Sequence, residues 1–267
     1  FLSENSKFAR HCFDQGVIFI GPSAEAIELM GEKDMAKREM EKAGISVVPG
    51  YYGEEQTKQF LFKQGEKLGY PLIIKSVLGG GGKGMRLVTS SENFLSELEA
   101  AKSESLAVFG DDQIILEKYF EAPRHIEVQV FADDFGNCIH TFERECSIQR
   151  RYQKLIEEAP APFLSGEIKE SLYETALKVA KEINYSGAGT VEFLVTTSSE
   201  DKEDEFFFME MNTRLQVEHP VSEAITGLDF VELQLDIASG NPLNINQNDI
   251  QCLGHAIESR IYAEDPQ

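Results

Sequence analysis

The residues between Phe206 and His219 have the types and spacing of a site for a metal ion and a small anion. They read FFFMEMNTRLQVEH. If the chain is extended here, a period of two places five polar side chains on one face, those of Glu210, Asn212, Arg214, Gln216 and Glu218. The preceding aromatic run favours burial of this face, and buried charges need partners or a bound ion. The alternative is an amphipathic strand whose polar face is solvated.

A second carboxylate, that of Glu192, lies on the strand expected just before this row. A hairpin between the two strands would bring Glu192 and Glu210 to the same face. Two carboxylates with the amide oxygen of Asn212 form a hard oxygen set, which suits Mg²⁺ bridging nucleotide phosphates better than zinc. Arg214 offers a planar fork for a small oxyanion, and Glu218 is a candidate base.

A glycine-rich run, GGGGKG at residues 79–84, separates two extended segments. Ordered glycines lose much backbone entropy, so we expect this loop to move until a ligand binds its N–H groups, and phosphate oxygens suit that role. The run is not a P-loop or a dinucleotide fingerprint, because no Ser or Thr follows Lys83 and no helix follows the loop. A plain hairpin tip and a β-hairpin lid over a nucleotide both remain open. In the lid, Lys75 would point a charge at the phosphates.

A cluster of cations, QRRYQK at residues 149–154, stands out in an acidic chain. It indicates either an anion site or a surface salt-bridge patch facing Glu157 and Glu158. The pair Arg124 and His125 opens a strand, where a structural histidine is the usual outcome.

The order of helical and extended patterns along the chain indicates an α/β protein. Apolar periodicity predicts helices over residues 24–30, 33–43, 54–68, 91–109, 167–183 and 229–238. Extended segments are expected over residues 17–20, 72–75, 85–88, 113–118, 125–132, 138–143, 190–195 and 205–211. Apolar and polar side chains alternate over residues 125–132, which is typical of a half-buried strand. An acidic loop at residues 198–204 is expected to be a solvated hairpin tip.

The composition is that of a globular protein with an acidic surface. The chain has 267 residues, is 42% hydrophobic and 27% charged, and carries a net charge of −21. This charge disfavours binding to nucleic acid or to a membrane surface, and an anionic substrate must be held by local cations. No apolar run reaches the roughly 18 residues that a membrane helix needs. Four scattered cysteines without a CxxC pair indicate buried thiols in a reducing compartment; they are Cys12, Cys138, Cys146 and Cys252.

Together these motifs resemble the ATP-grasp fold and, within it, the biotin carboxylase component of biotin-dependent carboxylases. The resemblance covers nearly the whole chain. The motifs that carry it are Phe19-Ile20-Gly21-Pro22, Lys75 with the glycine run, Glu117-Lys118-Tyr119-Phe120, Arg124-His125-Ile126-Glu127, Glu157-Glu158-Ala159-Pro160, Glu210-Met211-Asn212-Thr213-Arg214, Gln216-Val217-Glu218-His219-Pro220 and Tyr262-Ala263-Glu264-Asp265-Pro266. Among family members the likeness is greatest to the biotin-containing subunit of methylcrotonoyl-CoA carboxylase, with propionyl-CoA, acetyl-CoA and pyruvate carboxylases close behind.

The resemblance implies a mixed α/β (α+β) fold with a glycine-rich hairpin lid. Residues 1–31 would end an N-terminal biotin carboxylase domain, residues 32–240 would form the ATP-grasp domain, and residues 241–267 would begin a C-terminal domain. The lid subdomain is expected at about residues 47–119. The chain would then be a fragment of a longer enzyme.

The resemblance also implies an activity, ATP-dependent carboxylation of biotin by bicarbonate through carboxyphosphate. Its cofactors would be ATP, Mg²⁺ or Mn²⁺, and biotin carried on a domain absent from this chain. Residues matched to nucleotide contacts are Lys33, Lys75, Gly81, Gly82, Glu117, Lys118, Tyr119, Phe120, His125, Gln149, Glu192 and Glu210. Residues matched to metal ligands are Glu192, Glu210 and Asn212. Residues matched to bicarbonate contacts are Lys154, Arg214, Gln216 and Val217.

Four residues are matched to catalysis, namely Lys154, Arg214, Glu218 and Arg260. Glu218 would deprotonate bicarbonate, and Arg260 would stabilise the biotin enolate. Tyr152 stands where many family members have a histidine, and it is left out of the matched contacts because a phenol offers no positive charge to a phosphate near neutrality.

The implied partners are a biotin carboxyl carrier domain and a carboxyltransferase subunit within an oligomer. The implied location is the mitochondrial matrix, or the cytoplasm if the source is bacterial. Two alternatives stay open, another ATP-grasp ligase of the carbamoyl-phosphate synthase type and a truncated nucleotide-binding module without turnover. Which acyl-CoA finally receives the carboxyl group is left open by the sequence.

Overall fold

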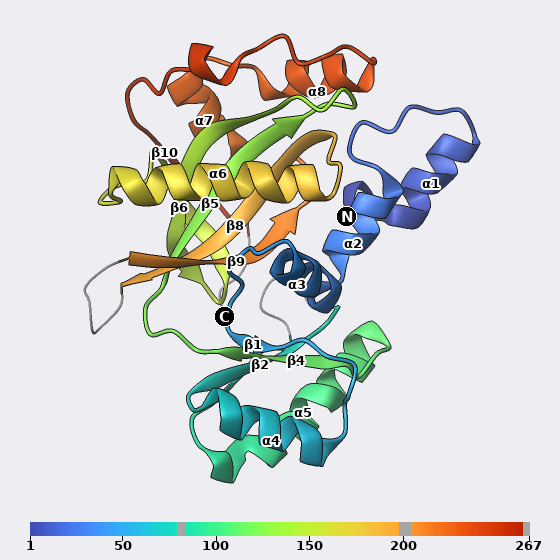
Figure 1. Ribbon diagram of the computed structural model, residues 1–267, viewed down its shortest axis with the longest axis vertical. Helices are drawn as coiled ribbons and strands as arrows, with labels where there is room; N and C mark the ends of the chain where they lie inside the picture. Colours follow the sequence, from blue (N-terminus) through green and yellow to red (C-terminus); the bar gives the residue numbers. More distant parts are fainter. Residues whose placement is uncertain (79–83, 198–203, 264–267) are drawn as a thin grey trace. The chain divides into compact units, whose positions relative to one another are not determined.

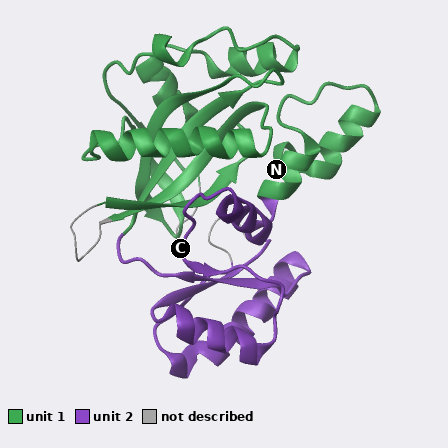
Figure 2. Ribbon diagram, viewed as in Figure 1, with its two compact units in different colours: residues 1–30, 123–267 green, residues 31–122 purple. Residues whose placement is uncertain are grey.

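The computed structural model describes residues 1–78, 84–197 and 204–263 (Figure 1). The chain forms two compact units, one of residues 1–30 and 123–267 and one of residues 31–122 (Figure 2). We call them unit 1 and unit 2. The predicted nucleotide contacts at Gly81 and Gly82 lie outside the described residues.

Unit 2 is an antiparallel sheet with two helices packed on it. The strand order is β1 (Gly50–Tyr51), β4 (Ile114–Lys118), β2 (Leu72–Ser76) and β3 (Arg86–Val88). Its helices are α3 (Lys33–Lys42), α4 (Lys58–Leu68) and α5 (Ser91–Phe109). Apolar side chains of the strands and of α4 and α5 share one core, which includes Leu61, Leu72, Ile74, Phe94, Leu98 and Leu116. The pairing of β2 with β3 confirms the hairpin expected around the glycine run.

The helix expected over residues 54–68 begins later, at Lys58. The residues before Lys58 make hydrogen bonds with residues outside the helix instead. The hydroxyl of Tyr51 bonds the backbone of Glu55, and the amide of Gln56 makes two bonds of 3.1 Å to the backbone of Ile114 on β4. By contrast α5 spans the predicted residues, because Ser90 and Asn93 form a capping box at its first turn.

Unit 1 is built on a six-stranded antiparallel sheet. Its order is β10 (Ala256–Ser259), β7 (Gln153–Ala159), β6 (Cys138–Arg150), β5 (Arg124–Ala132), β8 (Gly187–Thr197) and β9 (Asp204–Asn212). The longer helices are α1 (Ser6–Asp14), α2 (Ala24–Gly31), α6 (Gly166–Glu182), α7 (His219–Thr226) and α8 (Phe230–Ala238), and the short 3-10 turns are Leu2–Glu4 and Gln247–Asp249. With antiparallel sheets beside helices, the mixed class expected from the sequence is confirmed in its α+β form.

Both faces of this sheet are covered by helices. Neighbouring residues of β6 point to opposite faces, and Glu143 bonds Tyr173 of α6 whereas Arg144 bonds Ser222 of α7. The helix α8 packs on the α7 side, through Phe230 and Ile237, against residues of β5 and β8. Figure 1 shows α6 lying across the strands.

Because helices cover both faces of the sheet, one expectation is wrong. Residues 125–132 were expected to form a half-buried strand, yet Glu127 and Gln129 are as fully buried in β5 as the apolar residues between them. Buried polar groups of this kind need partners, which are described below.

Three further elements differ from expectation. The apolar run at residues 17–20 forms no strand, and Val17 and Ile18 are exposed. No extended segment is predicted over β7, whose first two residues, Gln153 and Lys154, belong to the predicted cation cluster. Helix α7 begins at His219, inside the stretch that was expected to stay extended. Pro220, in the first turn of α7, is the helix-start signal that marks it.

The cysteines are all free, as expected, although only Cys146 is buried. Cys12 and Cys138 are partly buried and Cys252 is exposed, which corrects the expectation of four buried thiols. Among the described residues, no helix has the length and apolar character needed to span a membrane.

Candidate active site

The centre of the candidate site is the ammonium group of Lys154 on β7. It donates to carboxylates from three different elements, Glu127 of β5, Glu192 of β8 and Glu218 at the start of α7. The distances to Glu192 and Glu218 are 2.8 and 2.6 Å. Burial lowers the pKa of Lys154, but the three carboxylates outweigh burial and raise it well above its ordinary value. Lys154 is therefore a fixed cation on the α7 side of the sheet.

A tight turn brings Lys154 to this place. Arg151 and Tyr152, between β6 and β7, both have positive φ, near 53° and 64°. Two central residues with positive φ are typical of the turn that joins the strands of a two-residue hairpin, because the twist of this turn matches the twist of the strands. The turn pairs Lys154 with Gln149 across the hairpin and leaves Tyr152 largely exposed. Of the cation cluster at residues 149–154, Lys154 is thus drawn into the group of carboxylates.

Glu218 lies between two cations. Its Oε1 accepts from Lys154, and its Oε2 accepts from Nη2 of Arg260 at 2.6 Å. Burial would raise the pKa of Glu218, but the charges of Lys154 and Arg144 and the hydrogen bond from Lys154 lower it to about 2. The group is a carboxylate at neutral pH. It becomes a better base when an anionic ligand takes over part of the bonding of those cations.

Acid should weaken the fold through Glu218, because its folded pKa of about 2 lies below its ordinary 4.5. A depressed carboxyl pKa gives stability that is present above pH 4.5 and is lost as the pH falls through about 2. The shift corresponds to on the order of 3 kcal/mol. Urea unfolding followed between pH 5 and pH 2 should show a flatter decline for Glu218→Gln than for the wild type. Equal slopes would show that Glu218 gains nothing from its cations.

Arg144 of β6, which the sequence analysis did not single out, organises the same face. It is fully buried, and its guanidinium donates to five side chains. The acceptors are Glu127 at 2.5 Å, Gln129 at 2.9 Å, Ser222 at 3.1 Å, Thr190 at 3.2 Å and Gln216 at 3.2 Å. Because a guanidinium has five N–H groups, its donor capacity is used in full. Arg144 thereby ties β5, β8, the loop at residues 213–218 and α7 together.

The predicted metal ligands meet as expected from strand alternation. Glu192 and Glu210 are direct partners across β8 and β9, and Thr190 pairs with Asn212. Oε1 of Glu192 accepts hydrogen bonds from Asn212 at 2.8 Å and Gln216 at 3.1 Å. Carboxylate and amide oxygens on one strand pair fit a hard cation such as Mg²⁺. A second grouping, His125 with Glu127 and Glu192, has ligand atoms within 4.8 Å of one another, but Lys154 and Arg144 already neutralise its carboxylates.

The extended row expected through Glu218 ends at Asn212, where β9 stops. Beyond it the chain turns, so Gln216 and Glu218 face the Lys154 cluster and Val217 is exposed. Arg214 points elsewhere. Its Nε donates to Glu4 at 2.9 Å, and its guanidinium lies 5.0 Å from the centre of the Phe1 ring. A single-faced row of five polar residues is therefore wrong.

His125 and Gln149 are brought together at the edge of the cluster. The Gln149 amide lies 2.9 Å from Nδ1 of His125, and Nε2 of His125 lies 3.0 Å from Glu192. Burial lowers the pKa of His125, but Glu192 raises it overall. The surface patch considered for the cations with Glu157 and Glu158 is wrong, because Glu157 bonds Arg260 and Glu158 bonds His255.

Unit 2 carries its own group of predicted nucleotide contacts. Glu117 is buried on β4, with Oε1 at 2.8 Å from Nζ of Lys37 and Oε2 bonded by Lys75. Burial would raise the pKa of Glu117, but the two lysines lower it. Lys37 is a partner that the sequence analysis missed. Lys33 opens α3, and backbone N–H groups of the predicted hinge are bonded, from Lys118 to Pro49 and from Tyr119 to Pro71.

Comparisons with known proteins assign the chain to a family. The family model described as "Carbamoyl-phosphate synthase L chain, ATP binding domain" matches residues 32–246, and the model described as "Biotin carboxylase, N-terminal domain" matches residues 1–27. The chain is 52% identical over 266 residues to methylcrotonoyl-CoA carboxylase subunit alpha, mitochondrial, of Dictyostelium discoideum, covering 100% of the chain and 37% of that protein. It is also 52% identical over 266 residues to biotin carboxylase of a Nostoc species, covering 100% of the chain and 58% of that protein.

Solved structures agree. Biotin carboxylase of Campylobacter jejuni, solved as a β-γ-ATP complex, superposes with a TM-score of 0.94 at 48% identity, over 99% of this chain and 58% of that one. The biotin carboxylase domain of Hydrogenobacter thermophilus 2-oxoglutarate carboxylase, solved with MgADP and bicarbonate, gives a TM-score of 0.93 at 46% identity, over 100% of this chain and 58% of that one. The chain spans about a third to three fifths of the relatives it matches. It belongs to the family of the carbamoyl-phosphate synthase L chain ATP-binding domain and, within that family, to the biotin carboxylases with their ATP-grasp fold.

Proposed function

We propose that this chain is the ATP-binding and bicarbonate-activating part of a biotin carboxylase. The observation that carries the proposal is the placement of Glu218 between Lys154 and Arg260. Each of these two cations can exchange one anionic partner for another, so bicarbonate can take over part of the bonding of Lys154 and Arg260 beside the base. Family membership and the contacts of Lys154, Glu218 and Arg260 support the proposal.

Glu218 takes the proton of bicarbonate. The freed oxygen then attacks the γ-phosphorus of ATP, the bond to ADP breaks, and carboxyphosphate forms. Lys154, Gln216, Val217 and Arg214 surround bicarbonate, for which Arg214 must exchange its present partner Glu4. Carboxyphosphate breaks into CO2 and phosphate, and the phosphate removes the ureido proton of biotin. Arg260 would lie beside the ureido oxygen of biotin, where its guanidinium would stabilise the negative charge needed for transfer of CO2 to the ureido nitrogen.

The nucleotide contacts follow the same assignment. Lys33, Lys75, Gly81, Gly82, His125 and Gln149 contact the phosphates or sugar, and the segment from Glu117 to Phe120 contacts adenine. Glu192, Glu210 and Asn212 hold Mg²⁺ or Mn²⁺, which when bound neutralises charge on the transferring phosphoryl group. Glu192 keeps its orientation through bonds from Lys154, Asn212 and Gln216.

The complete enzyme is proposed to be an acyl-CoA carboxylase of the methylcrotonoyl-CoA type in the mitochondrial matrix. Several relatives of that type are 51–53% identical to this chain. A propionyl-CoA carboxylase alpha chain of Ruegeria pomeroyi is 50% identical, and propionyl-CoA is the alternative acyl-CoA. Biotin on a carrier domain and a carboxyltransferase subunit in an oligomer complete the proposed machinery.

The proposed half-reaction can be tested by ADP release from the full-length protein with Mg-ATP. Release should depend on bicarbonate and increase when free biotin is added, because biotin accepts the carboxyl group. Release that needs ammonia or glutamine and yields carbamate would favour the carbamoyl-phosphate synthase type of ligase instead. Nucleotide binding without turnover in the full-length protein would favour a regulatory module.

A further inference from the structure

The guanidinium of Arg260 bonds two carboxylates, one on a strand and one at the start of a helix. Its Nε donates to Oε1 of Glu157 on β7 at 2.5 Å, and its Nη2 donates to Oε2 of Glu218 at 2.6 Å. Glu218 lies at the start of a helix after a loop, whereas Glu157 lies inside a strand that is paired on both sides. The two partners of Arg260 therefore differ in how firmly the fold holds them.

Glu157 is built into the sheet. Its side chain is fully buried, and its neighbours in the sheet are Glu258 of β10 and the strand β6. Within the described part of the chain its second oxygen, Oε2, has no hydrogen-bond partner, so its bond to Arg260 is its principal polar contact. Burial raises the pKa of Glu157, and the charge and hydrogen bond of Arg260 work against that rise. Each group thus favours the charged form of the other.

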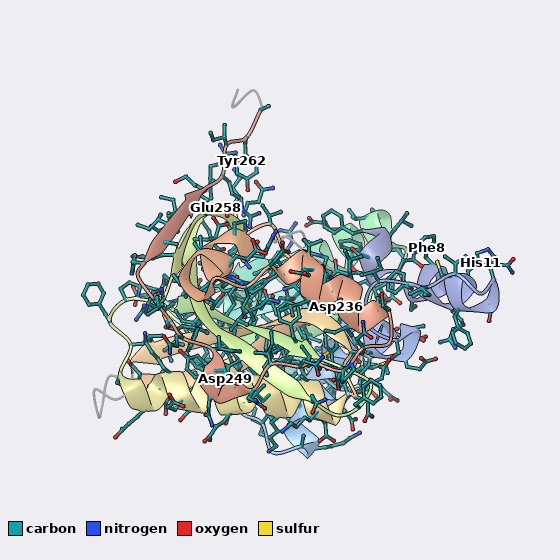
Figure 3. The ribbon with its side chains drawn as sticks, turned by 90° about the horizontal axis from the view of Figure 1, so that it is seen from above. Phe8, His11, Asp236, Asp249, Glu258 and Tyr262 are labelled. Atoms are coloured by element: carbon teal, nitrogen blue, oxygen red, sulfur yellow. The ribbon has the colours of Figure 1, made fainter. Side chains whose placement is uncertain are left out.

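Arg260 itself is fixed through its backbone. Its N–H donates to the carbonyl of Leu155 at 2.9 Å, which continues the pairing of β10 with β7. Two residues further on, the hydroxyl of Tyr262 donates to the carbonyl of Lys154 at 2.8 Å. Figure 3 shows Glu258 and Tyr262 along this segment. Among residues 1–78, 84–197 and 204–263, Nη1 of Arg260 makes no hydrogen bond, so one end of the guanidinium is open to a ligand.

The two carboxylates must behave differently during the reaction proposed above, on which this inference rests. When Glu218 takes a proton from bicarbonate it loses its charge, and its attraction for Nη2 of Arg260 weakens. Glu157 takes no part in that proton transfer. If Glu157 were absent, Arg260 would lose the remaining carboxylate that is hydrogen-bonded to its guanidinium in the described part of the chain, at the moment when it is needed for an oxyanion.

We propose that Glu157 is a positioning residue, the permanent anchor that keeps the guanidinium of Arg260 in place while Glu218 is protonated. Nη2, once released by Glu218, and Nη1 are then directed at the oxyanion of the biotin ureido group. Glu157 acts through Arg260 and touches no reacting atom. Its removal should therefore affect the biotin-dependent half of the reaction and spare the activation of bicarbonate.

Glu157→Gln tests this inference in the full-length protein, with Glu158→Gln as a matched control. The two residues are adjacent on β7, but Glu158 is partly exposed and pairs with His255 at 2.6 Å. Three quantities are measured for each variant: biotin-dependent ADP release, slow ADP release with bicarbonate but without biotin, and the dissociation constant of Mg-ATP. The unfolding temperature of each variant is recorded as well.

In Glu157→Gln we expect kcat for the biotin-dependent reaction to fall about 10- to 100-fold, the range for loss of a charged hydrogen bond. The biotin-independent reaction and the dissociation constant should match those of Glu158→Gln, whereas the unfolding temperature should be lower in Glu157→Gln because its ion pair is the more buried one. Equal kcat values for the two variants would overturn the inference, and so would a parallel fall of all readouts in Glu157→Gln, since that is the effect of a structural residue. A wild-type protein without any biotin-dependent release would overturn the proposed function itself.

Discussion

Glu218→Gln should lower bicarbonate-dependent ADP release by about 10²- to 10⁴-fold, the usual contribution of a positioned general base. Glutamine has nearly the same shape, and its one amide oxygen can still accept a bond from Lys154 or Arg260, but its NH2 group cannot accept and it cannot take a proton. Because Glu218 is 2% exposed, bulk water is poorly placed to substitute for it. The loss should appear in kcat, whereas the dissociation constant of Mg-ATP should change little, because no predicted nucleotide contact includes Glu218.

The measurement is steady-state ADP release at saturating Mg-ATP over a range of bicarbonate concentrations. Glu232→Gln is the control. The substitution also removes one glutamate carboxylate, but Glu232 is exposed on α8. The control should behave as the wild type does. A Glu218→Gln enzyme that kept a third or more of the wild-type kcat would assign the base to another residue.

Replacement of Arg144 should give the largest loss of stability in unit 1. Arg144→Met preserves volume but leaves the buried carboxylate of Glu127 and several polar acceptors without their donor. Breaking one side of a buried ion pair costs about 3–5 kcal/mol. Activity should fall as well, because Gln216 and, through Glu127, Lys154 lose the group that orients them.

Urea unfolding of the purified protein measures this loss. Arg10→Met is the control, because Arg10 is exposed on α1 and pairs with Glu25 and Glu28 at the surface, where such bonds contribute about 1 kcal/mol or less. Adding Glu127→Gln to Arg144→Met should restore part of the stability, since it removes the uncompensated charge. Equal unfolding free energies for Arg144→Met and Arg10→Met would contradict the organising role of Arg144.

Local pattern was enough to predict the parts of the site that depend on strand geometry. Side chains alternate along a strand, so Glu192 and Glu210 could be assigned to one face of a hairpin, and β8 and β9 pair them directly. The pairing of β2 with β3 followed in the same way from two extended segments on either side of the glycines. These inferences needed only residues close together in the sequence.

The cations that organise the site could not be found in this way, because their partners are distant in the sequence. Glu127 resembled a residue on a solvated strand face until α7 covered that face. Arg144 carried no motif, and its acceptors come from four separate segments. Arg214 was assigned by alternation, but its partner Glu4 is 210 positions away. Such contacts depend on tertiary packing, which a residue pattern in one element does not specify.

Transfer of an oxygen atom from bicarbonate to phosphate tests the central proposal most directly. The full-length protein is incubated with Mg-ATP, free biotin and ¹⁸O-labelled bicarbonate, and the phosphate is analysed by mass spectrometry. Attack by a bicarbonate oxygen on the γ-phosphorus predicts one ¹⁸O atom in each phosphate released, together with ¹⁴C in biotin when labelled carbon is used. Phosphate without ¹⁸O would contradict the account, because it would mean that water, and not bicarbonate activated at Glu218, attacks ATP.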